Sequence, residues 1–174
     1  MRQTQQRILL SIGLFLVWFL FVSVALYQMS FADYGEFDPS YQWHGLRVTL
    51  DRDKLQLPKQ QDWQLVHVLP KHCRCSALAE QHRKDISVEL SLTDDQQFYR
   101  TVEQVEAAGL QLPAVPAVLV FNAGKLVYAG PYASGPRCST THSFLPALIR
   151  GNVQLPATWL NGETKACRCV ITHI

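Results

Sequence analysis

The stretch LPAVPAVLVFNAGKLVYAG, residues 112–130, carries the clearest information about the fold. Residues 117–121 are apolar and rich in β-branched side chains, which is typical of a strand buried on both faces. The turn signal Asn-Ala-Gly follows at 122–124, and residues 125–129 return as a second strand. The sequence therefore predicts an antiparallel hairpin entered through a proline-rich segment.

Elements upstream of this hairpin alternate between strand and helix. Residues 63–69 predict a central buried strand that Pro70 ends, and a short helix is expected from about 76 to 84. Residues 86–92 alternate as a second strand would, and two strands joined through a helix run parallel.

The remaining elements complete a mixed α/β domain. A capping box at Thr93 to Gln96 predicts a helix whose apolar stripe is Phe98, Val102 and Val105 and which ends at Gly109. A last helix is expected at 141–150. The predicted fold class is α/β, with a mixed sheet flanked by helices.

Bulk composition limits the range of functions. A chain of 174 residues suffices for one domain of ordinary size, and a formal net charge of +2 without long basic runs argues against a nucleic-acid partner. No paired carboxylates, Ser/His/Asp set or phosphate-binding glycine loop stands out, and no cofactor is predicted.

Residues 8–27 form an uncharged apolar run long enough to cross a membrane as a helix. Arg2 and Arg7 precede it and no basic residue follows until Arg47, so the positive-inside rule predicts a cytoplasmic N-terminus and an exported domain. The alternative is a cleaved signal peptide with its site at 30–32 and a mature N-terminus at Asp33. We expect an uncleaved signal-anchor, a single pass through a bacterial inner membrane with the C-terminal domain in the periplasm.

This pattern divides the chain into five parts. Residues 1–7 are the cytoplasmic N-terminus, 8–27 the transmembrane helix, 28–62 a polar stalk, 63–151 the folded domain and 152–174 a tail. The tail contains a hairpin signal, Asn161-Gly162, followed by an alternating strand at 165–171.

Two cysteines stand directly after the first predicted strand. The turn reads His72-Cys73-Arg74-Cys75-Ser76, and Val115-Pro116 precedes the hairpin. With the order of elements, these residues resemble the thioredoxin superfamily over residues 60–150, and specifically an anchored, exported bacterial member of it. The resemblance implies a thioredoxin-like fold, a cis bond before Pro116, and a substrate-binding role for Val115 and Pro116.

The cysteine spacing departs from that family, because this chain has Cys-x-Cys where thioredoxins have Cys-x-x-Cys. Ser76 stands in the place of the resolving thiol, so we expect Cys73 to attack and Cys75 to resolve. A helix N-terminus and nearby basic residues favour the thiolate, and cysteines two residues apart in a turn can bridge. The resulting prediction is a thiol–disulfide oxidoreductase or isomerase that acts on protein thiols or disulfides.

Three further cysteines make the total odd, so one thiol stays free, pairs between chains or acts transiently. Cys167 and Cys169 repeat the Cys-Arg-Cys pattern and should share one face of a strand. Two bridged Cys-Arg-Cys pairs with Cys138 alone, or a bridge from the tail to Cys138, both remain open.

A non-catalytic reading is the alternative function. The domain would be a binding module, or a carrier of Cu(I) or zinc held by His72, Cys73 and Cys75, with Cys167, Cys169 and His173 as a similar set in the tail. Soft thiolates combined with imidazole suit both metals.

Overall fold

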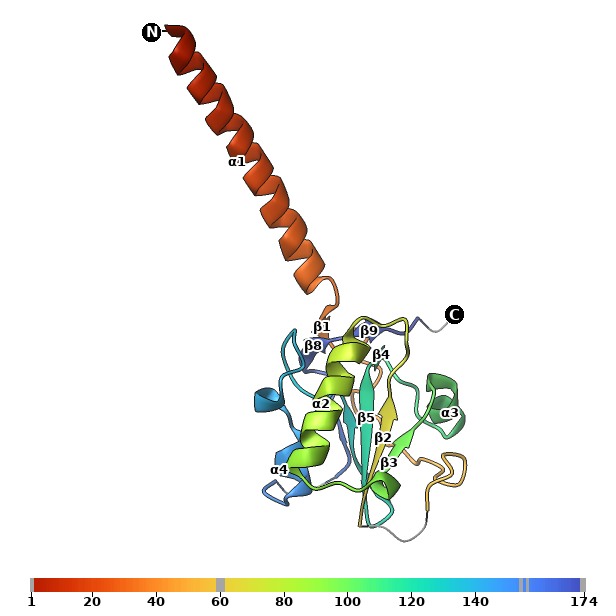
Figure 1. Cartoon of the computed structure of the whole chain (residues 1–174). Helices are drawn as coiled ribbons and strands as arrows, with labels where there is room; N and C mark the ends of the chain where they lie inside the picture. The colour runs from red at the N-terminus through yellow and green to blue at the C-terminus, as the bar shows by residue number, and fades with distance from the viewer. Residues whose placement is uncertain (1, 59–61, 154, 156, 173–174) are drawn as a thin grey trace. The chain divides into compact units, whose positions relative to one another are not determined.

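The structure is a computed structural model that describes residues 2–58, 62–153, 155 and 157–172. The chain divides into two compact units, Met1–Ala32 and Asp33–Ile174. The first unit contains helix α1 (Arg2–Phe31), whose segment Gln3–Met29 is long and apolar enough to cross a membrane (Figure 1). Its large apolar side chains are exposed, as a lipid-facing helix requires and as a signal sequence would also show.

A five-stranded mixed sheet organises the second unit, in the order β3-β2-β5-β6-β7 (Figure 1). The strands are β2 (Trp63–Val68), β3 (Gln97–Tyr99), β5 (Ala117–Asn122), β6 (Lys125–Gly130) and β7 (Trp159–Leu160). Strands β2 and β3 run parallel, β5 is antiparallel to both β2 and β6, and β7 runs parallel to β6. The predicted hairpin is confirmed, and the central strand predicted at 63–69 is β2, whose parallel partner is β3 and not residues 86–92.

The hairpin turns through Ala123 and Gly124, both with positive φ, at 46° and 79°. Two positive-φ residues in a two-residue loop match the twist of the flanking strands. Ala117 to Phe121 are all at most 1 % exposed, because β5 lies at the centre of the sheet. The apolar run that predicted this strand is therefore explained by burial on both faces.

Each face of the sheet has its own apolar core. Helices α2 (Cys75–Glu89) and α4 (Leu145–Ile149) cover one face, and Figure 1 shows α2 crossing it. The other face carries α3 (Val102–Ala107) and the N-terminal loops. On β2 the two faces alternate, with Leu65 in the first core and Val66 and Val68 in the second.

The strand predicted at 86–92 is wrong, because α2 continues through Glu89. The buried residues Cys75, Ala79, His82 and Ile86 recur at helical spacing, whereas Val88 is 82 % exposed. The period of 3.6 residues therefore prevails over the short alternation that suggests a strand.

The second strand of the parallel pair is β3, at residues 97–99, so Phe98 lies in a strand and not on a helix. The capping box at Thr93 and Gln96 is present but caps only the 3-10 turn η1 (Asp94–Gln96). Helix α3 begins later with its own capping box at Thr101, and Gly109 follows it with φ of 107°. The predicted last helix is likewise shorter, divided between the 3-10 turn η2 (Thr140–His142) and α4.

Residues 33–58, expected as part of a stalk, fold onto the domain. Phe37, Trp43, Leu55 and Leu57 are each at most 5 % exposed and belong to the core that also contains Cys73 and Cys75. The Trp43 indole Nε1 donates to the Gln111 carbonyl oxygen at 2.8 Å. Scattered large apolar residues in a polar segment give no periodic signal, so this contribution to the core cannot be predicted from the sequence pattern.

The tail does not form the predicted local hairpin. Strand β7 joins the edge of the main sheet beside β6, whereas β8 (Lys165–Cys167) pairs with β1 (Tyr34–Glu36). Strand β9 (Cys169–Val170) pairs antiparallel with β4 (Ala114–Val115). The segment predicted as one strand at 165–171 is thus two short strands with different partners.

Candidate functional site: two disulfides beside Val115 and Pro116

Two disulfides join the cysteine pairs at opposite ends of the domain. Cys73 bonds to Cys169 with a Cα–Cα distance of 5.8 Å, and Cys75 bonds to Cys167 with 5.6 Å. Each Cys-Arg-Cys pair is therefore bridged to the other, which differs from both pairings considered from the sequence. The two tail cysteines lie on different short strands, Cys167 on β8 and Cys169 on β9, and each bonds to one cysteine of the first pair.

Strand β4 seats the tail beside the first cysteine. The Val115–Pro116 bond is cis, as the resemblance implies, and Val115 lies opposite Cys169 in the antiparallel β4–β9 pair. The Ile171 amide donates to the Pro113 carbonyl oxygen at 2.9 Å and extends this pairing. The Cys73 Sγ lies 3.5 Å from the Val115 carbonyl oxygen. Cys73, Val115 and the tail strand thus meet at one point.

The second disulfide joins the start of α2 to β8, beside the segment that begins at Asp33. Tyr34 lies opposite Cys167 in the β1–β8 pair, and the Cys75 Sγ is 4.0 Å from the Asp33 carbonyl oxygen. Arg168, between the two tail cysteines, donates its amide to Asp33 at 2.6 Å and its guanidinium to the Glu36 carbonyl oxygen. The tail is therefore held by backbone bonds on both sides as well as by sulfur.

The first cysteine pair sits at the start of α2, which begins at Cys75 with Arg74 as its N-cap. Ser76 donates its hydroxyl to the Pro70 carbonyl oxygen at 2.8 Å, which fixes the turn between β2 and α2. Cys75 is fully buried and Cys73 is 4 % exposed, whereas Cys167 and Cys169 are half-buried. Burial thus differs between the domain's cysteines and those of the tail.

An open cavity of about 560 Å³ reaches Cys73 at this end of α2. Its lining residues are Leu69, Lys71, Cys73, Arg74, Ser76, Ala77, Glu80 and Tyr99. The Glu80 carboxylate is engaged by Arg83 at 2.9 Å, and this hydrogen bond holds the pKa of Glu80 below its usual value. Lys71 and Arg74 also line this cavity, and neither takes part in an ion pair among the described residues.

Cys138 is the free thiol that the odd cysteine count predicts. Burial raises its pKa to about 12, so the thiol is a poor nucleophile. Its carbonyl oxygen accepts a hydrogen bond of 2.7 Å from the Nδ1 of His82, a buried residue of α2. Cys138 is thus part of the packing between α2 and the following loop and not of the disulfide cluster.

His67 is a buried polar residue on β2, and no sequence motif marks it. Its Nδ1 forms a hydrogen bond of 2.7 Å with the Tyr132 hydroxyl, and the two rings stack at 5.8 Å. Within the described residues its Nε2 is buried without a hydrogen-bond partner. Burial, followed by the charge of Arg83, lowers the pKa of His67 to about 3, so the side chain is neutral at ordinary pH.

Neutral His67 makes the folded state sensitive to acid. The unfolded chain binds a proton here below about pH 6.5, whereas the folded chain does not until about pH 3. We expect the wild type to lose stability relative to His67→Gln as the pH falls through this window, by up to ~1.4 kcal/mol per pH unit. Urea unfolding from pH 7 to pH 4 measures this difference. Parallel curves for the two proteins would contradict the prediction, and His44→Gln, at an exposed position, is the control.

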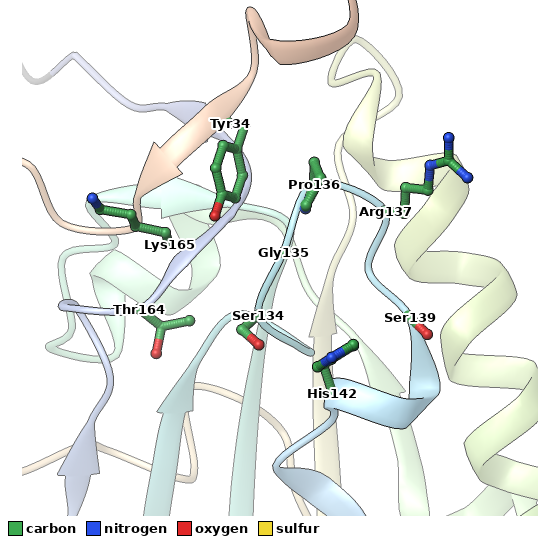
Figure 2. Close-up of a pocket in the computed structure, with 9 residues that line it drawn as sticks. All are labelled: Tyr34, Ser134, Gly135, Pro136, Arg137, Ser139, His142, Thr164 and Lys165. Atoms are coloured by element: carbon green, nitrogen blue, oxygen red, sulfur yellow. The ribbon is translucent and has the colours of Figure 1, made fainter.

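A second cavity, of about 620 Å³, lies beside β8 and is drawn in Figure 2. The loop of Ser134 to Arg137 forms one wall, and the Gly135 carbonyl accepts the Cys167 amide at 3.2 Å. Figure 2 shows the side chains of Arg137 and Lys165 extending to opposite sides. Their positive charges therefore do not converge in this cavity.

The structure brings the predicted site residues Cys73, Cys75, Val115 and Pro116 into one region. The proposed metal set does not form a cluster with His72, because both cysteines are consumed in disulfides. No group of three or more metal-binding side chains occurs within the described residues, and His173 lies outside them. The signal that could have revealed the cross-pairing is the repetition of Cys-Arg-Cys at both ends of one domain.

The fold and site define a mixed α/β domain with two disulfides at one end of its sheet, accompanied by an N-terminal helix of membrane-spanning length. The family described as a domain of unknown function, DUF6436, matches residues 46–171, well over half of the chain. The protein belongs to this family. A comparison with curated proteins gives no match. The matched range contains all five cysteines and the Val115–Pro116 bond.

Proposed function

We propose that the protein is a membrane-anchored, thioredoxin-like thiol–disulfide oxidoreductase or isomerase that works outside the cytoplasm. The order of β2, α2 and β3 followed by the β5–β6 hairpin supports a thioredoxin-like fold. In this proposal Cys73 attacks, Cys75 resolves, and Val115 and Pro116 seat the substrate.

One observation carries the proposal. The Cys73–Cys169 disulfide lies beside Val115, which precedes the cis bond to Pro116. Cys169 belongs to an extended strand that pairs with Val115. That arrangement is what a mixed disulfide between Cys73 and an extended substrate requires, because the substrate backbone is held while its sulfur meets the attacking one. The tail here supplies the strand from within the same chain.

The exchange reaction balances without a cofactor. Once thiols have reduced both disulfides, the Cys73 thiolate attacks one sulfur of a substrate disulfide, and the second substrate sulfur leaves as a thiolate. The Cys75 thiolate then attacks the Cys73 sulfur, which releases the first substrate sulfur and leaves a Cys73–Cys75 bond. The substrate gains two electrons and the protein loses two, and the reverse sequence oxidises a substrate dithiol.

The apolar helix and the disulfides together support this location. Disulfides persist in oxidising compartments and are rare in the cytosol. Arg2 and Arg7 precede the uncharged apolar run at residues 8–27, which favours a cytoplasmic N-terminus and a periplasmic domain. A domain held at the inner membrane would meet exported proteins as they emerge.

Trapping tests the proposal directly. In a Cys138→Ser/Cys167→Ser/Cys169→Ser background, which removes the tail thiols that bond to the domain, Cys75→Ser keeps a free attacking thiol and lacks a resolving one, so mixed disulfides with exported proteins should accumulate. Cys73→Ser is the matched control and should trap at least about tenfold less. Both variants are compared by non-reducing gels and mass spectrometry of the membrane fraction. Equal or absent trapping in the two variants would overturn the assignment of Cys73.

A binding module is the second candidate, favoured by the fact that all four clustered cysteines hold the tail in place. In that case the disulfides are structural and the domain binds a partner without chemistry. The metal version requires reduced thiols. Reconstitution of the reduced full-length protein with Cu(I) or zinc, followed by metal analysis, would support it only at close to one equivalent.

A further inference from the structure

We infer that the two disulfides can re-pair into Cys73–Cys75 and Cys167–Cys169, which releases the tail from β4 and opens that edge to an extended, cysteine-containing polypeptide. The re-pairing is independent of any substrate, whereas the nature of the partner rests on the proposed function. The disulfide count stays at two, so the step needs only a catalytic thiol.

The step begins at the sulfur that lies in the cationic cavity, although the tail cysteines Cys167 and Cys169 are more exposed than Cys73. Cys73 lines the open cavity of about 560 Å³ at the start of α2, with Lys71 and Arg74 beside it. These cations attract an incoming thiolate. Cys75 is fully buried. Cys138 does not supply the thiol from within, because burial raises its pKa to about 12. The trigger is therefore an external thiol that attacks the Cys73 sulfur.

The exchange then proceeds in three balanced steps. The external thiolate bonds to the Cys73 sulfur, and Cys169 leaves as a thiolate. The Cys169 thiolate attacks the Cys167 sulfur, forming Cys167–Cys169 and expelling the Cys75 thiolate. The Cys75 thiolate attacks the Cys73 sulfur, forming Cys73–Cys75 and returning the external thiolate. No electrons are gained or lost by the protein.

The backbone of the first pair already suits its new bond. Arg74 has φ of −60° and ψ of −31°, so the turn from Cys73 to Cys75 is helical. Helix geometry separates Cα atoms two residues apart by about 5.4 Å, within the range of about 4.4–6.8 Å that a disulfide spans. Cys167 and Cys169 lie in extended strands in this structure. Their backbone can adopt the turn that a Cys167–Cys169 bond requires only after their disulfides to the domain are broken.

Release of the tail removes the strand paired with β4. Ala114 and Val115 lose their partners Val170 and Cys169, and Pro113 loses the amide of Ile171. An exposed edge of this kind is completed by an extended polypeptide. Ile171 packs against the apolar core, whereas Val170 is 46 % exposed. The edge therefore favours a cysteine followed two residues later by an aliphatic side chain.

Disulfide mapping of the full-length oxidised Cys138→Ser protein in detergent tests the re-pairing. Substoichiometric glutathione is added, the reaction is quenched with acid and alkylated, and disulfide-linked peptides are identified. We expect Cys73–Cys75 and Cys167–Cys169 to appear without loss of total disulfide, and amide exchange at Ile171 to accelerate at least about tenfold. The inference would be overturned if, at every glutathione concentration up to full reduction, the only linked peptides were the original pairs or Cys73–Cys167 with Cys75–Cys169.

The double variant Cys75→Ser/Cys167→Ser is the matched control, since it keeps the Cys73–Cys169 bond but cannot re-pair. Its Ile171 amide should keep the slow exchange under the same catalytic thiol. If the disulfides re-pair but the trapping experiment captures no substrate, the proposed function is refuted and this inference stands. If substrate is trapped but the tail never leaves β4, this inference is refuted and the proposed function stands.

A synthetic peptide pair tests the partner class. One peptide carries cysteine with leucine two residues later, and the other has aspartate in place of leucine. The re-paired protein should form its mixed disulfide with the leucine peptide roughly tenfold faster. Equal rates would show that the vacated edge does not select its partner in this way.

Discussion

Replacing all four bonded cysteines by alanine should lower the free energy of unfolding by about 7 kcal/mol, whereas removing either disulfide alone should cost only about 2 kcal/mol. The two bonds span 96 and 92 residues of sequence and are nested one inside the other. In the chain-entropy model, whichever bond remains still closes the long loop. The second bond then closes only the small ring formed by residues 73–75 and 167–169.

Urea unfolding of the oxidised full-length protein in detergent measures these effects. The two pairwise variants, Cys73→Ala/Cys169→Ala and Cys75→Ala/Cys167→Ala, should be destabilised by similar amounts. Cys138→Ala is the control for the loss of an unbonded cysteine. Pairwise losses that add up to the effect of the fourfold variant would show that the bonds do not share a loop.

Phe37→Ala should destabilise the domain by about 3–5 kcal/mol, the usual result of emptying a large buried site. Phe37 is fully buried and its ring centroid lies 5.7 Å from that of Trp43. Its amide donates to the Thr164 carbonyl oxygen at 2.9 Å, which couples the segment after α1 to the tail. A residue in a detached stalk would show almost no effect, so the substitution separates the two architectures.

Tyr41→Ala is the matched control for this experiment. Tyr41 lies in the same segment but is 62 % exposed, so its loss should change stability by no more than about 0.5 kcal/mol. Both variants are measured by urea unfolding with the disulfides intact. Equal, small effects for Phe37 and Tyr41 would mean that residues 33–58 do not contribute to the core.

The cross-paired disulfides change how the cysteine motif is interpreted. Cys-Arg-Cys at the start of α2 suggests a self-contained redox pair, yet each of its sulfurs bonds to the tail. The strand that the tail contributes to Val115 occupies the position that the proposed chemistry requires for a substrate. In the proposed function, the tail strand keeps this site closed until a thiol reaches Cys73.

Local patterns were sufficient for the elements at the centre of the sheet. The run at 117–121 is uniformly apolar, and the run at 63–68 is apolar apart from Gln64 and His67, because both strands lie inside the sheet and are covered on both faces. The turn at Ala123-Gly124 is specified by backbone conformation within two residues. The strand prediction at 86–92 is wrong because four apolar residues at alternating positions fit a strand as well as the end of a helix. Only the burial of Ile86 in the core that also contains Leu65 and Val120 decides between them.

The sequence by itself determined an apolar N-terminal helix of membrane-spanning length, a mixed α/β domain with a central hairpin, and an odd thiol among five cysteines. Only the tertiary structure decided the cysteine partners and the place of Phe37 and Trp43 in the core. The physical reason is that disulfide pairing depends on which Cα atoms lie within about 6 Å of each other. For bonds that span more than 90 residues, the pairing of β4 with β9 and of β1 with β8 sets that proximity.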